Sequence, residues 1–114
     1  MMKPELYTPE SYKNASSYEK DRVCNGCGPK GIGSVVIPNS IWGVNITQAC
    51  NVHDWMYDRG CTIQDKEQAD RVFLNNMIRL IGHSSFRWLT RLRQMSARNY
   101  YRAVRDFGGP YFWA

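Results

Sequence analysis

Four side chains capable of chemistry lie close together between residues 50 and 57. They are Cys50, His53, Asp54 and Tyr57. At about 100° per residue on an α-helix, they fall within one arc of roughly 100°. Most of the opposite side is apolar, with Val52, Trp55 and Met56. A helix with one apolar side and one chemically rich side is expected to lie at the centre of the fold.

A second helix is predicted to carry a carboxylate on its apolar side. Residues 65–68 read Asp-Lys-Glu-Gln, which is typical of a capping box, and the helix runs to about Ile81. Asp70 shares one arc of this helix with Phe73, Leu74, Met77 and Ile81, whereas Arg71, Asn75 and Arg79 face away. A carboxylate in that position is costly unless it is paired or hydrogen-bonded. We therefore expect a partner for Asp70 in the core.

A glycine-rich segment with two cysteines precedes both helices. Residues 24–33 read Cys-Asn-Gly-Cys-Gly-Pro-Lys-Gly-Ile-Gly, and such glycines let backbone carbonyl oxygens converge on one point. Those carbonyls and the Asp54 carboxylate are hard oxygen ligands, which suit Ca²⁺. His53 could then act as general base on a water molecule, with Asp70 accepting the other ring N–H. The plainer interpretation of the segment is a disulfide-bound turn that binds nothing.

The remaining elements predict a single, mostly α domain over residues 1–114, built on an antiparallel helical pair. Asn45 is expected to cap the helix that carries the His-Asp pair, and Gly60 to end it. The others are a helix from about 9 to 19, a strand or buried connector at 34–37, a turn at 39–43, and a third helix from about 86 to 107, ended by residues 108–110.

The positive charge is concentrated in the last part of the chain. The net charge is +5, and residues 71–114 hold eight arginines against one aspartate. Such a surface suits an anionic membrane, a nucleic acid or an acidic protein, although a solvated basic helix would look the same. No stretch is apolar enough to cross a bilayer, and the first residues lack the apolar core of a secretory signal.

The four cysteines allow two interpretations. They are Cys24, Cys27, Cys50 and Cys61, and an even number suggests either two disulfides, with three possible pairings, or a metal site. Cys24-x-x-Cys27 together with Cys50-x-x-His53 is an acceptable spacing for a structural zinc. The arginine-rich helix, with Trp88, Tyr100 and Tyr101, would then be a nucleic-acid-binding face. This binding module leaves Asp70 without a role.

Three motifs of the chain, taken together, are similar to those of one known family. They are Cys-Gly-Pro-Lys-Gly at 27–31, Ala-Cys-Asn-Val-His-Asp-Trp-Met-Tyr at 49–57 and Ala-Asp-Arg-Val-Phe at 69–73. They resemble secreted phospholipase A2, and in particular its smaller bacterial, phage and viral relatives. In that family's signature a Cys precedes a His-Asp pair and a Tyr follows it, and here Cys50, His53, Asp54 and Tyr57 hold those places.

The resemblance implies calcium-dependent hydrolysis of the sn-2 ester of glycerophospholipids. His53 would be the base, Asp70 the carboxylate behind it, and Tyr57 a hydrogen-bond donor to Asp70. Asp54 would bind Ca²⁺ together with carbonyl oxygens of the glycine-rich segment, namely those of Gly28, Gly31 and a residue near Gly26. A relative of the same fold that has lost its catalysis and only binds lipid is the other alternative that the resemblance leaves open.

The resemblance also implies disulfides and a membrane partner. It pairs Cys27 with Cys50, which leaves Cys24 with Cys61, and two disulfides favour a secreted or extracytoplasmic location. The expected partner is an anionic phospholipid surface, and no nucleic acid is expected; the oligomeric state is not indicated. Three aromatic residues could reach into that surface or belong to the core: Trp42, Phe112 and Trp113.

Overall fold

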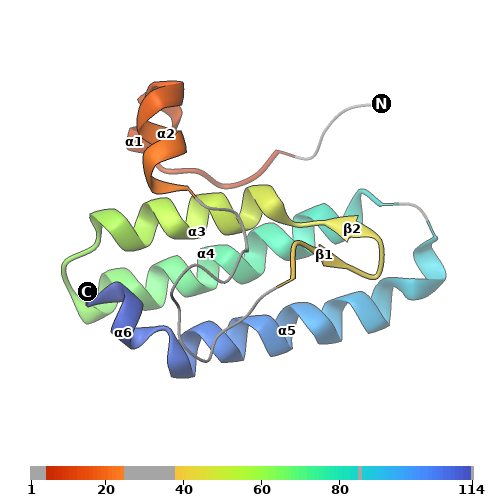
Figure 1. Ribbon diagram of the computed structural model, residues 1–114. Coiled ribbons are helices and arrows are strands. Elements are labelled where there is room, and N and C mark those ends of the chain that lie inside the picture. Colours follow the sequence, from red (N-terminus) through yellow and green to blue (C-terminus); the bar gives the residue numbers. More distant parts are fainter. Residues whose placement is uncertain (1–4, 25–37, 85, 114) are drawn as a thin grey trace.

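The computed structural model describes residues 5–24, 38–84 and 86–113. These segments are mostly helical, as the sequence predicts, and contain one short β-hairpin (Figure 1). In chain order the elements are α1 (Glu10–Asn14), α2 (Ser17–Val23), β1 (Ser40–Ile41), β2 (Val44–Asn45), α3 (Thr47–Arg59), α4 (Ile63–Gly82), the 3₁₀ helix η1 (Arg87–Leu89), α5 (Thr90–Phe107) and α6 (Gly109–Phe112). None of the helices described here is long and apolar enough to cross a membrane.

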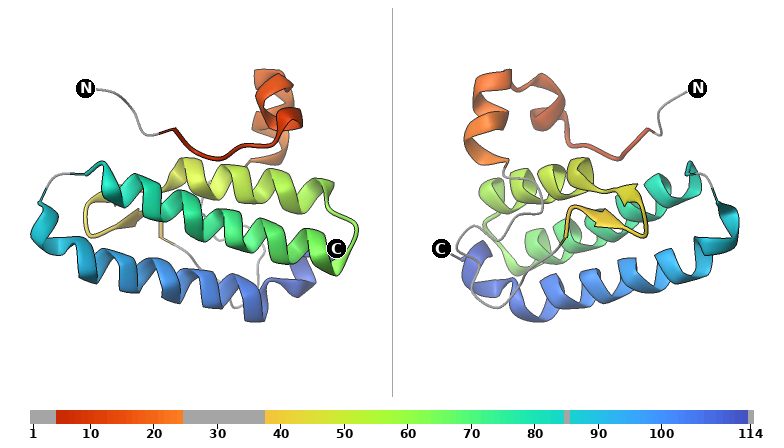
Figure 2. Two further views of the ribbon diagram at one scale, coloured as in Figure 1. Left: turned by 180° about the vertical axis from the view of Figure 1, so that it is seen from behind. Right: turned by 45° about the vertical axis from the view of Figure 1, so that its right-hand side comes forward.

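Helices α3, α4 and α5 pack side by side and form the body of the molecule (Figure 1, Figure 2). α3 and α4 run antiparallel, and α5 returns along α4. The apolar arc predicted for α4 faces the core, because Phe73, Met77 and Ile81 are at most 2% exposed. The polar residues predicted to face away, Arg71, Asn75 and Arg79, are exposed.

Helix α4 begins earlier than predicted because its capping box is a different one. Thr62, not Asp65, is the N-cap residue: its hydroxyl accepts a hydrogen bond from the Asp65 N–H at 3.1 Å. The Asp65 carboxylate accepts in return from the Thr62 N–H at 3.1 Å. Two unpaired amides of the first turn are satisfied in this way.

The single helix predicted over residues 9–19 is wrong, because the chain breaks it into α1 and α2. Ala15 and Ser16 have extended backbone. The Ser16 hydroxyl accepts a hydrogen bond from the Glu19 N–H at 3.1 Å, so it starts a new helix rather than continuing the first. α1 then packs on α3, where the Trp55 indole N–H donates to the Ser11 hydroxyl at 3.0 Å.

The last part of the chain also contains more elements than predicted. Phe86 has left-handed backbone (φ 59°), and η1 precedes α5 where one continuous helix was expected. After Gly108, the tail forms the short helix α6, with Pro110 in its first turn. Phe112 of α6 is buried, at 6% exposure, whereas Trp113 is 58% exposed.

The predicted turn at 39–43 is part of an antiparallel hairpin. β1 and β2 pair Ser40 with Asn45 and Ile41 with Val44. The two residues between the strands, Trp42 and Gly43, have φ values of 47° and 86°. Two successive positive φ angles are the geometry of the tight turns that join twisted strands.

Candidate active site

His53 of α3 faces Asp70 of α4 across the interface between the two helices. The His53 Nε2 atom lies 2.8 Å from Asp70 Oδ1. Both residues are buried, at 7% and 1% exposure. The partner that the sequence required for Asp70 is therefore the histidine, as the resemblance implies. This geometry is possible because each residue lies on the inward arc of its own helix.

Tyr57 joins the same carboxylate oxygen. Its hydroxyl donates a hydrogen bond to Asp70 Oδ1 at 2.6 Å. The centroid of its ring lies 4.1 Å from that of the His53 ring, and the centroid of the Phe73 ring lies 4.7 Å from the same imidazole. The imidazole is thus held by a hydrogen bond and by two aromatic rings, which fixes its orientation.

Lys66 is the residue of this network that sequence reasoning missed. Its ammonium group lies 2.8 Å from Asp70 Oδ2, and Lys66 is only 5% exposed. It also donates to the carbonyl oxygens of Val104 and Arg105, each at 3.1 Å, at the end of α5. The four-residue spacing of Lys66 and Asp70 was a usable signal, because it places both on one side of a helix.

Hydrogen bonding keeps Asp70 ionised despite its burial. Burial alone would raise the pKa of this carboxyl, but hydrogen bonds from His53, Lys66 and Tyr57 outweigh it and lower the pKa below its usual value. The opposite holds for Tyr57: burial, with the adjacent Asp70 carboxylate, raises the pKa of its hydroxyl. Tyr57 therefore stays a donor and Asp70 an acceptor at neutral pH.

The ionised carboxylate determines which ring nitrogen of His53 can accept a proton. Asp70 can only accept, so in neutral His53 the proton lies on Nε2. Nδ1 then carries the lone pair. Within residues 5–24, 38–84 and 86–113, Nδ1 has no hydrogen-bond partner. The arrangement is that of a general base oriented and electrostatically supported by a carboxylate.

The end of the chain closes over Tyr57. The Phe112 ring of α6 packs edge-on against the Tyr57 ring at 5.3 Å. Gly108, which ends α5, approaches so closely that a Cβ atom there would lie 2.7 Å from the Tyr57 hydroxyl oxygen. Sequence reasoning gave the tail no role in the site, because it cannot reveal this packing between residues that lie far apart in the chain.

The predicted metal ligands are only partly within the described structure. Asp54 lies half-buried on α3, immediately after His53. Burial and the nearby Asp54 carboxylate raise the pKa of Cys24 to about 11, so Asp54 lies near the residue that precedes segment 25–37. Gly26, Gly28 and Gly31, with the predicted connector at 34–37, belong to that segment and lie outside the described residues. No group of three or more His, Cys, Asp or Glu side chains in the described segments could hold a metal ion.

The predicted disulfide between Cys24 and Cys61 is wrong, because both thiols are free. The Cys24 thiol donates to the Asn51 carbonyl oxygen at 3.3 Å, whereas Cys61 is exposed beyond the end of α3. Cys50 is disulfide-bonded, and Cys27, its implied partner, lies outside the described residues.

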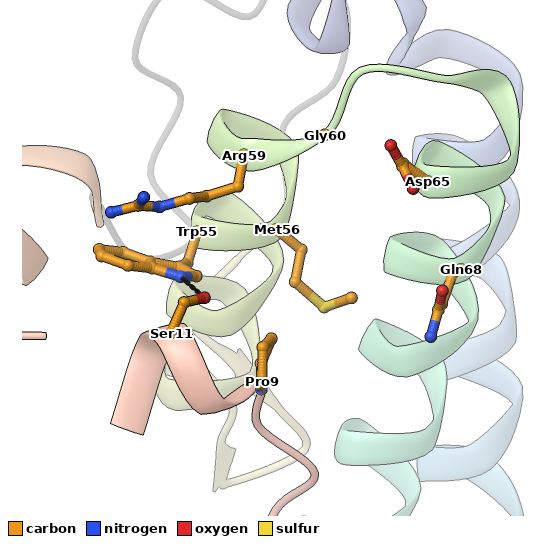
Figure 3. Close-up of a pocket in the computed structure, with 8 residues that line it drawn as sticks. All are labelled: Pro9, Ser11, Trp55, Met56, Arg59, Gly60, Asp65 and Gln68. Carbon is orange, nitrogen blue, oxygen red and sulfur yellow. Dashed lines mark hydrogen bonds between the residues drawn. The ribbon is translucent and has the colours of Figure 1, made fainter. Parts of the chain in front are cut away.

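A separate small pocket lies on the other side of α3 (Figure 3). It is lined by Pro9, Ser11, Trp55, Met56, Arg59, Gly60, Asp65 and Gln68. The Trp55 ring is held there by the Ser11 hydroxyl and by the Arg59 guanidinium, which lies 4.3 Å from the ring. His53 and Asp70 do not line this pocket, so we assign it to the packing of α1 rather than to chemistry.

Comparison with known proteins identified no relative: no family model, no curated protein and no solved structure matches this chain. The geometry around His53 and Asp70 is therefore the basis for a functional assignment, together with the motifs of the sequence.

Proposed function

We propose that this protein is a calcium-dependent, phospholipase A2-like hydrolase that cleaves the sn-2 ester of glycerophospholipids. The observation that carries the proposal is the buried His53–Asp70 pair, at 2.8 Å. Among the described residues, the Nδ1 atom of His53 is left to accept a proton. The antiparallel packing of α3 and α4, which bring the two residues together, supports a phospholipase A2-like domain over residues 1–114.

The proton chemistry follows from the hydrogen bonds. His53 Nδ1 accepts a proton from a water molecule as the oxygen of that water attacks the ester carbonyl carbon. The imidazolium that forms is stabilised by Asp70, whose carboxylate stays ionised because Tyr57 and Lys66 also donate to it. His53 then returns the proton to the leaving alcohol oxygen.

Asp54 is the proposed calcium ligand that lies within the described residues. Asp54 offers a hard carboxylate oxygen next to the base and near Cys24, where the glycine-rich segment begins. Gly26, Gly28 and Gly31 are the proposed carbonyl donors. When bound, the ion would supply positive charge that stabilises the developing oxyanion. We also propose a secreted or extracytoplasmic location, and the proposed Cys27–Cys50 disulfide is its remaining support.

The deciding experiment is fatty-acid release from anionic phospholipid vesicles, in millimolar calcium or with a chelator. We expect calcium-dependent release, reduced roughly 10²–10⁴-fold in His53→Asn because the base is removed. His83→Asn is the matched control, since the other histidine of the chain is exposed. Asp54→Asn should abolish calcium-dependent release, whereas Asp58→Asn, exposed on the same helix, should not.

Two results would count against the proposal. If the folded wild-type protein releases no fatty acid from any phospholipid, the chain is not a hydrolase and the lipid-binding alternative replaces it. If Asp54→Asn keeps full calcium-dependent activity, the calcium carboxylate has been assigned to the wrong residue.

A further inference from the structure

Two large aromatic residues adopt an unfavourable backbone conformation and expose their rings. Trp42 (φ 47°) and Phe86 (φ 59°) are the non-glycine residues with positive φ in the described part of the chain. Their exposed fractions are 55% and 66%. Left-handed backbone is costly for a bulky residue and persists only where the surrounding structure holds it. The protein therefore contains something that keeps both aromatics in place.

Arg93 of α5 holds both residues. It is only 3% exposed. Its guanidinium donates to the Trp42 carbonyl oxygen at 2.9 and 3.2 Å, and more weakly to the Phe86 carbonyl oxygen at 3.5 Å. The Trp42 indole N–H reaches the Ser96 hydroxyl of α5 at 3.3 Å. One buried arginine thus fixes the tip of the hairpin and the start of η1 against α5.

Three more exposed apolar side chains continue this surface along one side of η1 and α5. Trp88, Leu92 and Met95 are 77%, 43% and 58% exposed. Leu92 and Met95, three residues apart, lie on one side of α5, and Trp88 lies on η1 just before that helix. We call Trp42, Phe86, Trp88, Leu92 and Met95 the aromatic face. η1 and the start of α5 lie at the end of the molecule where α4 gives way to α5 (Figure 1). A cluster of exposed apolar side chains of this kind marks an interaction surface.

The charged residues next to the aromatic face along η1 and α5 are positive. Arg87 and Arg91 alternate with its residues, Arg98 follows on the same helix, and all three are exposed. The sequence contains no Asp or Glu between residues 84 and 105. Tryptophan and arginine together suit the headgroup region of an anionic bilayer. Leu92 and Met95 suit the hydrocarbon below it, which a nucleic acid does not offer.

We propose that the aromatic face is the surface through which this protein docks on an anionic phospholipid bilayer. The inference rests on the proposed function in naming phospholipid as the partner, and it adds the residues that make the contact. It also assigns Arg93 a role: the buried guanidinium positions the membrane-contacting aromatics and does not itself meet the lipid. The tail aromatic Trp113, at the other end of α5, is not part of this surface.

The test is sedimentation of the full chain with phosphatidylglycerol or phosphatidylcholine vesicles in the presence of a calcium chelator, so that binding is measured without turnover. We expect binding to phosphatidylglycerol. Trp88→Ala should weaken it about tenfold through lost apolar burial, and Arg91→Glu roughly tenfold through charge. Trp113→Ala and Arg71→Glu are the matched controls, exposed and outside the face, and should bind as the wild type does.

The outcomes separate this inference from the enzymatic one. Vesicle binding that depends on Trp88 supports docking even when no ester is hydrolysed. If the protein hydrolyses dispersed short-chain lipid but does not bind vesicles, the proposed docking surface is wrong and the proposed enzymatic activity stands. Equal binding by wild type and Trp88→Ala, or binding to an oligonucleotide in place of vesicles, would also overturn it.

Discussion

Replacing Lys66 with methionine tests the network behind His53. The ammonium group has three hydrogens, and the structure gives it three acceptors: Asp70 Oδ2 at 2.8 Å and the carbonyl oxygens of Val104 and Arg105 at 3.1 Å. Methionine keeps an unbranched apolar side chain, one atom shorter, and removes the charge. Asp70, 1% exposed, would then keep its negative charge with one partner fewer, and two carbonyls at the end of α5 would lose a donor.

The expected loss of stability at pH 7 is about 3–5 kcal/mol, the typical effect of removing one member of a buried ion pair. The sign of its pH dependence follows from Asp70. The pKa of Asp70 is lowered in the folded protein, so its contribution is present above the unfolded value of about 3.9 and is lost as the pH falls through the folded pKa. Without Lys66, burial continues to raise this pKa while one opposing hydrogen bond is gone. The difference between the two proteins should therefore shrink as the pH falls below about 4.

Urea unfolding followed by circular dichroism at pH 7 and at pH 3 measures both quantities. A double-mutant cycle with Asp70→Asn isolates the pair, since Lys66→Met should cost much less when no carboxylate remains. Lys13→Met, exposed on α1, is the control for loss of a lysine charge. A Lys66→Met protein within about 0.5 kcal/mol of wild type at pH 7, the usual range for a surface substitution, would refute the reasoning. An equal loss in the Asp70→Asn background would refute it too.

Two further predictions concern the packing and the thiols. Gly108→Ala should destabilise the protein by about 1–3 kcal/mol, because the new Cβ atom would lie 2.5 Å from the Val104 carbonyl oxygen and 2.7 Å from the Tyr57 hydroxyl oxygen. Gly82→Ala, with no heavy atom within 4 Å, is the control. A Gly108→Ala protein that melts at the same temperature as the wild type would contradict the prediction. In a thiol-labelling time course at pH 8, exposed Cys61 should react quickly and Cys24 roughly 100-fold more slowly. The reason is that burial raises the pKa of Cys24 to about 11 and leaves little thiolate. Equal labelling rates for the two thiols would contradict this prediction.

Helical periodicity made the centre of the site predictable. His53 and Tyr57 share one side of α3, and Asp70 lies on the inward side of α4, so the need for a buried partner of Asp70 followed from spacing alone. The break between α1 and α2 was missed for a local reason: Ser16 could continue a helix or cap a new one, and its hydroxyl does the latter. The calcium ligands at Gly26, Gly28 and Gly31 stay a prediction.

Contacts between distant segments were beyond the sequence. Lys66 finds two of its three acceptors at the end of α5, 38 and 39 residues away, and Gly108 meets Tyr57 only because the tail folds back. The predicted pairing of Cys24 with Cys61 was wrong because the number of cysteines in a sequence does not indicate which of them are neighbours in space.

The sequence by itself determined that three long helices form, the sides on which their reactive groups lie, and the concentration of arginine in the last part of the chain. Only the tertiary structure decided that Lys66 also binds Asp70, which arginine is buried beneath the aromatic face, and which aromatics remain exposed. The physical reason is that side-chain direction along a helix repeats with the backbone and can be counted from the residues. Pairing between helices depends instead on how all of them pack together, and no local pattern encodes it.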